Sequence, residues 1–301
     1  MGFTTDELKH ATLFPNPEKA EKLVKSGAFT TPEKIKAVLG EFTFPEPGER
    51  RPYLYGCMVL SFDGKMGFSD NPEGTLISKQ NRFDPRGAKT DFWILNVCRC
   101  YADAVIMGTG TLRARMSKLW YAEISDADLL EARKTLGKKS LIPPSIIASA
   151  DGKDIPFEHP VFSMTPAPLI MTSEEGAEYI KKRMKREIRF VTEAENLYEE
   201  SDVIRVLISG DKIADTAGLM KLLRDCGVKY ASVEAPGYIW NLIHSGFLDE
   251  YLLNYSGVMA GGNVGIGMGL PFSYEAHPHA ELLSVGFTKG FLFTRQKLIY
   301  D

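Results

Sequence analysis

The chain of 301 residues has room for one large domain or two small ones. Hydrophobic residues make up 44% and charged residues 25%, which excludes disorder, collagen-like repeats and coiled coil as the main state. With 36 Lys and Arg against 39 Asp and Glu, the net charge of -3 argues against nucleic-acid or anionic-membrane binding as the main function. Four cysteines without C-x-x-C spacing, and no membrane-length apolar run, predict a cytoplasmic protein with reduced thiols.

The first fifty residues are expected to form a helical extension and linker, residues 1–50, ahead of a main domain, residues 51–301. Two helices are predicted from their proline-led starts and closing glycines: Asn16-Pro17-Glu18 to Gly27, and Thr31-Pro32-Glu33 to Gly40. The charged, proline-rich stretch 45–52 marks the boundary. Because such short helices are marginal alone, we expect the extension to pack on the main domain or on a second subunit, with a lid as the alternative.

Beyond this boundary, short apolar segments alternate with segments of helical spacing. Strands are predicted at Tyr53 to Phe62, Ala104 to Met107, Ser145 to Ala148, Leu169 to Thr172, Ile188 to Val191, Val203 to Ile208, Tyr230 to Val233 and Tyr251 to Tyr255, and helices at Thr90 to Tyr101, Leu219 to Cys226 and Tyr238 to Ser245. Residues 287–300 predict a hairpin that turns near Gly290. The pattern indicates an α/β fold with a mostly parallel sheet, helices on both faces and an antiparallel C-terminal edge.

Open α/β sheets bind ligands beyond the carboxyl ends of their strands, so the residues after each strand are candidates for the site. The glycines of Gly108-Thr109-Gly110-Thr111 would let a ligand approach the backbone, and the threonines and free N–H groups suit a phosphate. A plain strand-to-helix turn is the equal alternative. Pro236 or Gly237 would open a helix whose N-terminus could receive a phosphate, and Glu234 before it could be a site residue or only a capping acid.

Two further segments have both a structural and a functional interpretation. In Ser61-Phe62-Asp63-Gly64-Lys65, the Asp-Gly pair favours a type I′ turn, while Asp63 and Lys65 could border a site. Arg99 shares a helical face with Phe92 and Leu95, so it needs an anionic partner, such as a ligand phosphate, or a route to solvent.

Two other segments give no metal or phosphate signal. The glycine-dense stretch 261–269 is interpreted as a loop. His277 and His279 lack a third ligand at metal spacing and are interpreted as surface residues, so we expect no metal site.

Together these segments resemble the riboflavin-biosynthesis reductase domain, the C-terminal half of bacterial bifunctional deaminase–reductases, which has a dihydrofolate-reductase-like fold. The matching segments are Pro52 to Lys65 with its opening strand and S-L-D-G-K, Ala102 to Thr111 with its A-D-A-I-L-V-G-x-G-T, Leu222 to Gly237 with its L-x-x-x-G-V-x-x-V-L-V-E-G-G-P, Phe247 to Glu250 with its G-L-V-D-E, and Gly261-Gly262 with its L-L-G-G. Their order and spacing agree over about residues 52 to 301.

The resemblance implies an NADPH-dependent reductase that passes a hydride to the opened ribose of a pyrimidine ribosylamine phosphate. It implies cofactor contacts at Val59, Leu76, Gly108, Gly110, Thr111, Pro236, Gly237, Tyr238, Ile239 and on to Asn241. It implies substrate contacts at Ser78, Arg99 and Glu234, and a reacting end bordered by the catalytic candidates Asp63, Lys65 and Glu234. A homodimer is also implied, with the aromatic strand around Phe287, Phe291 and Phe293 as the buried edge.

The sequence departs from the family pattern at two places. The acidic pair that follows G-T in the family is replaced by Leu112-Arg113-Ala114-Arg115, and Glu-Gly-Gly-Pro has become Glu234-Ala235-Pro236-Gly237, which removes one N–H. Arg113, Arg115 and Lys118 could read the 2′-phosphate of NADPH or could be an exposed basic helix start.

We therefore expect a stand-alone NADPH-dependent reductase of a small heterocyclic, imine or carbonyl substrate. Two alternatives stay open. The first is a pterin- or folate-type reductase with Glu234 as its acid, and the second is a non-catalytic NADPH-binding regulator.

Overall fold

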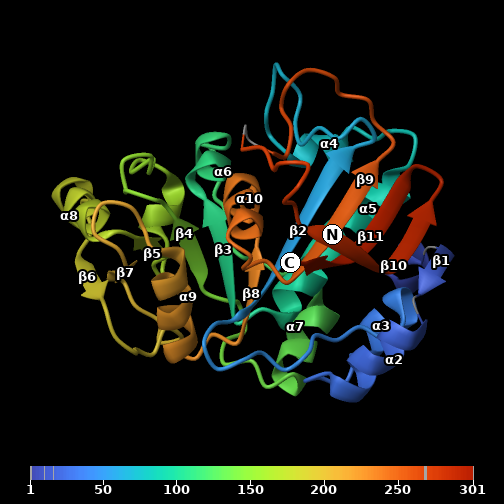
Figure 1. Ribbon diagram of the computed structural model, residues 1–301, viewed down its shortest axis with the longest axis horizontal. Helices are drawn as coiled ribbons and strands as arrows, with labels where there is room; N and C mark the ends of the chain where they lie inside the picture. Colours follow the sequence, from blue (N-terminus) through green and yellow to red (C-terminus); the bar gives the residue numbers. More distant parts are fainter. Residues whose placement is uncertain (1, 10, 16, 268–269, 301) are drawn as a thin grey trace.

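The computed structural model describes residues 2–9, 11–15, 17–267 and 270–300, and its strands form one mixed sheet (Figure 1). The strands are β1 (Ala11–Pro15), β2 (Tyr53–Ser61), β3 (Ala104–Gly108), β4 (Ser145–Ala148), β5 (Leu169–Thr172), β6 (Ile188–Val191), β7 (Ile204–Ile208), β8 (Tyr230–Val233), β9 (Glu250–Ser256), β10 (His279–Thr288) and β11 (Phe291–Ile299). The helices are α1 (Thr5–Leu8), α2 (Pro17–Ser26), α3 (Glu33–Leu39), α4 (Thr75–Lys79), α5 (Pro85–Tyr101), α6 (Thr109–Arg113), α7 (Ala127–Thr135), α8 (Glu174–Arg183), α9 (Thr216–Asp225) and α10 (Pro236–His244), with a 3-10 turn at Pro160–Ser163.

The strand order is β1-β10-β11-β9-β2-β8-β3-β4-β5-β7-β6. Every neighbouring pair from β9 to β6 is parallel. The other pairs, β9 with β11, β11 with β10 and β10 with β1, are antiparallel. The predicted α/β class, with its mostly parallel sheet and antiparallel C-terminal edge, is therefore confirmed.

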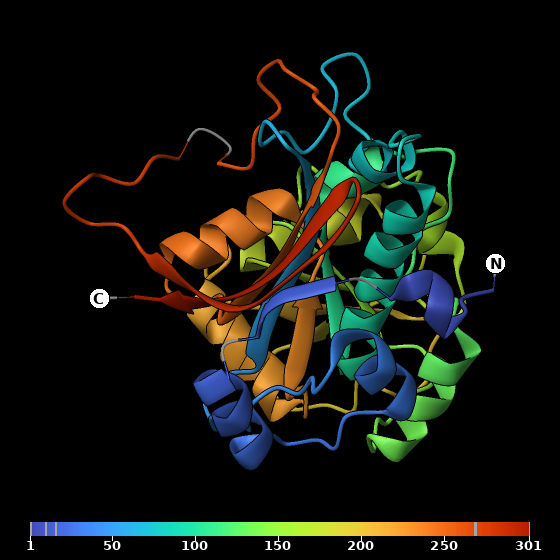
Figure 2. The same cartoon turned by 90° about the vertical axis from the view of Figure 1, so that its right-hand side faces the viewer.

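Each central strand sends alternate side chains to two separate apolar cores, because successive residues of a strand point to opposite faces. In β2, Tyr55 and Cys57 join the core beneath α5, α7 and α8, whereas Leu54 and Leu60 join the core beneath α9 and α10. Figure 2 shows α5 and α10 on opposite sides of the sheet. Parallel strands buried on both faces explain why they appear in the sequence as short continuous apolar runs.

The N-terminal segment contains the two predicted helices, α2 and α3, but it is not wholly helical. β1 pairs antiparallel with β10, with Ala11 opposite Phe287, so the expectation of an all-helical segment was wrong. The sequence analysis did not predict β1 because the strand is short, ends on a proline and pairs only with a strand that is distant in the sequence. Phe42 and Phe44 belong to the same core as α5, so this segment packs on the main body of the chain.

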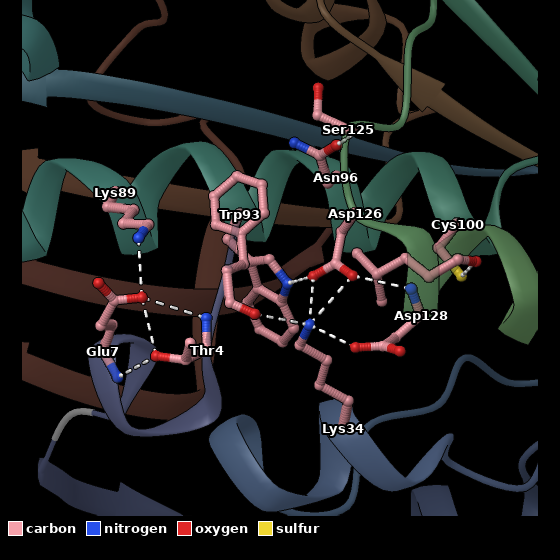
Figure 3. Close-up of polar contacts among 12 residues, drawn as sticks. Thr4, Glu7, Lys34, Lys89, Trp93, Asn96, Cys100, Ser125, Asp126 and Asp128 are labelled. Carbon is pink, nitrogen blue, oxygen red and sulfur yellow. Dashed lines mark hydrogen bonds and ion pairs between the residues drawn. The ribbon is translucent and has the colours of Figure 1, made fainter. Parts of the chain in front are cut away.

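A partly buried lysine ammonium group connects this segment to the rest of the protein (Figure 3). Nζ of Lys34 donates to the carbonyl of Phe3 at 2.9 Å and lies 2.8 and 2.6 Å from carboxylate oxygens of Asp126 and Asp128. Asp126 also accepts from Nε1 of Trp93 on α5 at 2.7 Å. The network thus links α3, α5 and the start of α7.

The C-terminal hairpin is confirmed, with β10 beginning earlier than predicted, at His279. Its second strand, β11, lies between β10 and β9 and is therefore not an edge of the sheet. Phe291 and Phe293 are buried in the chain's own core, while Phe287 is partly exposed. The part of the dimer prediction that placed this aromatic strand at a sheet edge was wrong, and dimerisation itself stays a prediction.

Candidate active site

A cavity of about 1700 Å³ opens beyond the carboxyl ends of β2, β3, β4, β5 and β8. These strands are parallel, so the segments that follow them meet at one end of the sheet, where α4 and α6 also lie (Figure 1). Single small-molecule pockets are usually about 300–1,000 Å³, so this cavity has room for two ligands side by side. One half is bordered by α4 and α5, and the other by α6, α10 and the segment after β4.

The α5 face predicted from sequence does line the cavity. α5 is longer than predicted and begins at Pro85, because Asp84 caps it by accepting from the N–H of Gly87 at 2.9 Å. Asp91, Leu95 and Arg99 recur every four residues, so they lie on one helical face, and all three border the cavity.

Arg99 forms a buried ion pair with Glu234. Its Nε and Nη2 donate to the two carboxylate oxygens of Glu234 at 2.7 and 2.6 Å, and its Nη1 donates to the carbonyl of Glu123 at 2.6 Å. Burial opposes the charge, but attraction to Glu234 outweighs it and raises the pKa of Arg99 above its usual value. The partner that the sequence argument required is thus a protein carboxylate.

This pairing changes the interpretation of Glu234. Both of its carboxylate oxygens accept hydrogen bonds from Arg99, so it is already committed as an acceptor. The alternative of Glu234 as the acid of a pterin-type reductase loses its support.

Asp91 is a site residue that the sequence analysis missed. It is 9% exposed and lines the cavity, and its Oδ1 accepts from Nδ2 of Asn254 at 2.7 Å. Burial raises the pKa of Asp91 to about 6, while hydrogen bonds from Asn254 and Ser78 limit the rise. The signal in the sequence was its spacing of eight residues before Arg99 on the predicted helix.

The other half of the cavity has the features expected of a phosphate site. Gly108, Gly110, Thr111 and the first turn of α10 line it, and a Cβ at Gly110 would meet only open space and the end of Arg113. α10 begins at Pro236, and its N-cap residue Ala235 makes no side-chain cap hydrogen bond, so first-turn N–H groups have no helical partner. Such a helix start favours an anion.

A carboxylate also lies in this half. Asp154 accepts hydrogen bonds from the hydroxyls of Thr109 and Ser149 and lies 3.5 Å from Nη1 of Arg113. The basic residues that follow have an acidic partner as well, since Arg115 and Lys118 each lie 3.3 Å from Glu73. The three basic side chains considered for the 2′-phosphate are therefore each paired within the chain.

Of the other site residues expected from the sequence, Ser78, Val59, Pro236, Gly237 and Tyr238 line the cavity, and their contacts with a ligand stay a prediction. Four other candidates do not border it: Asp63, Lys65, Leu76 and Ile239. Ile239 is fully buried in the core beneath α10.

Asp63 instead holds a neighbouring loop. It accepts from Ser61 and from the amides of Ala260 and Gly261 at 2.6, 3.0 and 2.7 Å. These bonds, the one from Ser61 first, lower its pKa to about 2. The turn itself is closed from the N–H of Gly64 to the carbonyl of Ser61, so Gly64 is its fourth residue and the predicted type I′ turn centred on Asp-Gly was wrong.

The predicted loop around residues 261–267 is confirmed, while residues 268 and 269 lie outside the described part of the chain. In both views it runs beside the segment after β2, and the N–H of Met66 donates to the carbonyl of Val264 at 3.0 Å (Figures 1 and 2).

Other site chemistries find no support in the part of the chain that the structure describes. It holds no cluster of three metal-ligating side chains, and His277 and His279 are exposed. None of its helices has the length and apolar character that a bilayer crossing requires. All four cysteines are free and buried.

Comparison with known proteins agrees with this architecture. A family model described as the RibD C-terminal domain matches residues 52–284. A pyrimidine reductase-like protein from Corynebacterium diphtheriae superposes with a TM-score of 0.57 at 17% identity, covering 83% of this chain and 93% of that one. RibD from Acinetobacter baumannii superposes with a TM-score of 0.55 at 16% identity. This superposition covers 83% of the present chain and 58% of the longer RibD chain. No curated protein matches.

At these identities the superpositions show the fold alone, and they confirm the fold predicted from the sequence resemblance. Because the family model spans most of the chain, the protein belongs to the RibD C-terminal domain family.

Proposed function

We propose that this chain is an NADPH-dependent reductase of a small substrate that contains a C=N or C=O bond, with 5-amino-6-(5-phosphoribosylamino)uracil as the first candidate. The observation that carries the proposal is the two-part cavity, in which a phosphate-type half adjoins a half with buried ionisable groups. Membership of the RibD C-terminal domain family supports a reductase-type oxidoreductase.

The residues of the phosphate-type half fit a dinucleotide. Gly110 leaves the backbone accessible, whereas a Cβ at Gly108 would lie 3.2 Å from Cβ of Ala235, so Gly108 allows β3 to end close to the start of α10. The start of α10 offers N–H groups without helical partners for a pyrophosphate. Pro236 has no N–H to contribute, so Gly237 and Tyr238 would be the donors. When bound, the cofactor supplies a hydride.

The remaining tasks fall to the chain's own residues. Arg99 and Glu234 form a hydrogen-bonded ion pair that lines the cavity. The guanidinium of Arg99 has N–H groups beyond those bonded to Glu234 and Glu123, and these can donate to a substrate oxygen. The guanidinium carbon of Arg99 lies 5.7 Å from the centroid of the Trp120 ring, within the range of a cation–π contact. Positioning of this kind is the main contribution of protein in such reductions.

The test is a titration with NADPH and NADH followed by tryptophan fluorescence. Trp120 lines the cavity, whereas Trp93 is fully buried beside Asp126 and Trp240 donates to the carbonyl of Leu270 without bordering the cavity, so Trp120 should give the signal. We expect saturable quenching with NADPH preferred, lost in Trp120→Phe although calorimetry still detects binding. Absence of binding to either nucleotide by calorimetry would refute the proposal.

A substrate screen then separates the reductase from a non-catalytic NADPH-binding protein. Oxidation of NADPH with the pyrimidine ribosylamine phosphate or a related acceptor supports the reductase. Tight NADPH binding without turnover of any acceptor would favour the binding protein instead. Light scattering at micromolar protein tests the proposed homodimer, which a monomer would refute.

A further inference from the structure

We infer that Asp91 is the proton donor of this cavity, and that the substrate is a compound whose nitrogen takes up a proton as the adjacent carbon is reduced. The inference rests on the proposed reductase function and adds to it a catalytic residue and a substrate class. The feature that points to it is a buried carboxyl group on the wall of the substrate half, hydrogen-bonded to an amide and without a cationic partner among the described residues.

The position of Asp91 combines access to the cavity with removal from bulk water. Its side chain projects from the first half of α5 into the cavity wall and is 9% exposed. Asn254 from β9 is 1% exposed and donates to Oδ1 at 2.7 Å, which fixes the orientation of the carboxyl group. Ser78 of α4, also buried, holds it from a third element.

The charges around Asp91 do not favour its ionised form. Among the described residues, no cation forms an ion pair with it. Arg99, two turns further along α5, is committed to Glu234, and Lys89 is paired with Glu7 at 2.8 Å. Cys57, which lies close by on β2, is a buried thiol whose own pKa is raised.

The groups that face Asp91 are therefore an amide, a hydroxyl and a thiol. Burial without a cation leaves the carboxyl protonated up to a pH near 6, about two pH units above an ordinary aspartate.

The cavity is lined by four other acids, of which Glu123 is exposed and the remaining three are engaged by other side chains. Glu234 receives the bidentate bonds of Arg99, Asp154 receives two hydroxyls and lies near Arg113, and Glu73 lies between Arg115 and Lys118. A carboxylate that accepts from a cation has no proton to give. Asp91 is thus the buried acid of this cavity that can hold a proton near neutral pH.

The substrate carbon receives a hydride, which carries both electrons, and the electron pair of the C=N π bond moves to nitrogen. The Asp91 O–H bond breaks and an N–H bond forms, which leaves an amine and the Asp91 carboxylate. Water re-protonates the carboxylate after product release. Asn254 and Ser78 stabilise the transient negative charge, because both donate to this carboxyl group.

Two variants test the state of the proton without any turnover. Infrared difference spectra of wild type against Asp91→Asn, which is nearly isosteric, should show the C=O band of a protonated carboxyl at pH 5 and its loss by pH 8. In Asn254→Leu the band should persist to higher pH. The hydrogen bond from Asn254 stabilises the charged carboxylate in the wild type, so its removal raises the pKa of Asp91 further. A wild type without this band at pH 5 would overturn the inference.

Two acceptors test the donor role. One is a quinoxalinone, a weakly basic cyclic imine that needs a proton, and the other is its N-methylated iminium salt, which needs none. Asp91→Asn should slow NADPH oxidation by the neutral imine about 10²–10⁴-fold and leave the iminium reaction unchanged. Asp6→Asn, whose side chain is 92% exposed, is the matched control and should change neither rate.

Each outcome is decisive. If Asp91→Asn reduces both acceptors as fast as wild type, Asp91 is not the donor and the reductase function stands. If wild type oxidises NADPH with neither acceptor nor with the pyrimidine ribosylamine phosphate, the reductase function fails. The donor role then falls with it, even where the infrared band identifies a protonated carboxyl.

Discussion

The guanidinium of Arg99 and the carboxylate of Glu234 join α5 to the segment after β8 through two parallel hydrogen bonds, although 135 residues separate them in the chain. Both side chains are at least nine-tenths buried. A planar guanidinium matches a carboxylate in this geometry, whereas a lysine could not. The pair therefore fixes the distance between the helix that carries Asp91 and the strand end that leads into α10.

Replacing one member of this ion pair should lower the free energy of unfolding far more than replacing both members together. We expect Arg99→Met or Glu234→Leu alone to lower the free energy of unfolding by about 3–5 kcal/mol, because either leaves one buried charge unpaired. The double variant should lose much less than the sum. Urea unfolding of the four proteins measures the coupling. Additive losses would show that the two side chains do not depend on one another.

Asp91 should make the protein less stable as pH rises. Its pKa is about 6 in the folded state against 3.8 in the unfolded chain, so the folded state binds more protons between these values. The stabilisation is fully present below pH 3.8 and is lost as pH passes through 6, a total of about 3 kcal/mol. Asp91→Asn cannot ionise and should be the more stable protein at pH 8. Urea unfolding of both proteins at several pH values between 4 and 8 measures this. A difference in the free energy of unfolding that does not change with pH would contradict the prediction.

The N-terminal segment should depend on Lys34 for its attachment (Figure 3). Lys34→Met leaves Asp126, whose side chain is 2% exposed, without its cation, and we expect a loss of about 3–5 kcal/mol in the free energy of unfolding. Limited proteolysis should then cut first within residues 2–50. Asp128→Asn is the control, since Asp128 is 69% exposed, and it should cost less than about 1 kcal/mol. Equal effects of the two substitutions would refute the role of the buried carboxylate.

The sequence predicted what depends on local patterns. β3, β4, β5 and β8 were found because parallel strands buried on both faces are short apolar runs, and the start of α2 because Pro17 opens it. β1 was missed because its only signal is a partner more than 250 residues away, at Phe287.

The site was only partly predictable, for the same reason. That Gly108, Gly110 and Gly237 line the cavity follows from their places after strands. That Arg99 meets Glu234, or that Asp91 is buried beside Asn254, depends on how distant elements pack. Asp63 lies in a motif typical of a site residue, but its carboxylate accepts hydrogen bonds from the amides of Ala260 and Gly261, which are distant in the sequence. No local pattern predicts such contacts.

The hydrogen bonds to Asp63 should protect the loop amides from exchange with solvent. Asp63→Ala should speed hydrogen exchange at the amides of Ala260 and Gly261, because both lose their acceptor. Asp70→Ala, a change at an exposed residue of the neighbouring segment, should leave them protected.

In the wild type the same protection should depend on pH. The pKa of Asp63 is lowered to about 2, so its contribution is present above pH 3.8 and is lost as pH falls through 2. Exchange measured by NMR at these two amides, corrected for the intrinsic rate, reports it directly. Protection in Asp63→Ala equal to that of the wild type would mean that the loop is held by other contacts, such as the bond between Met66 and Val264.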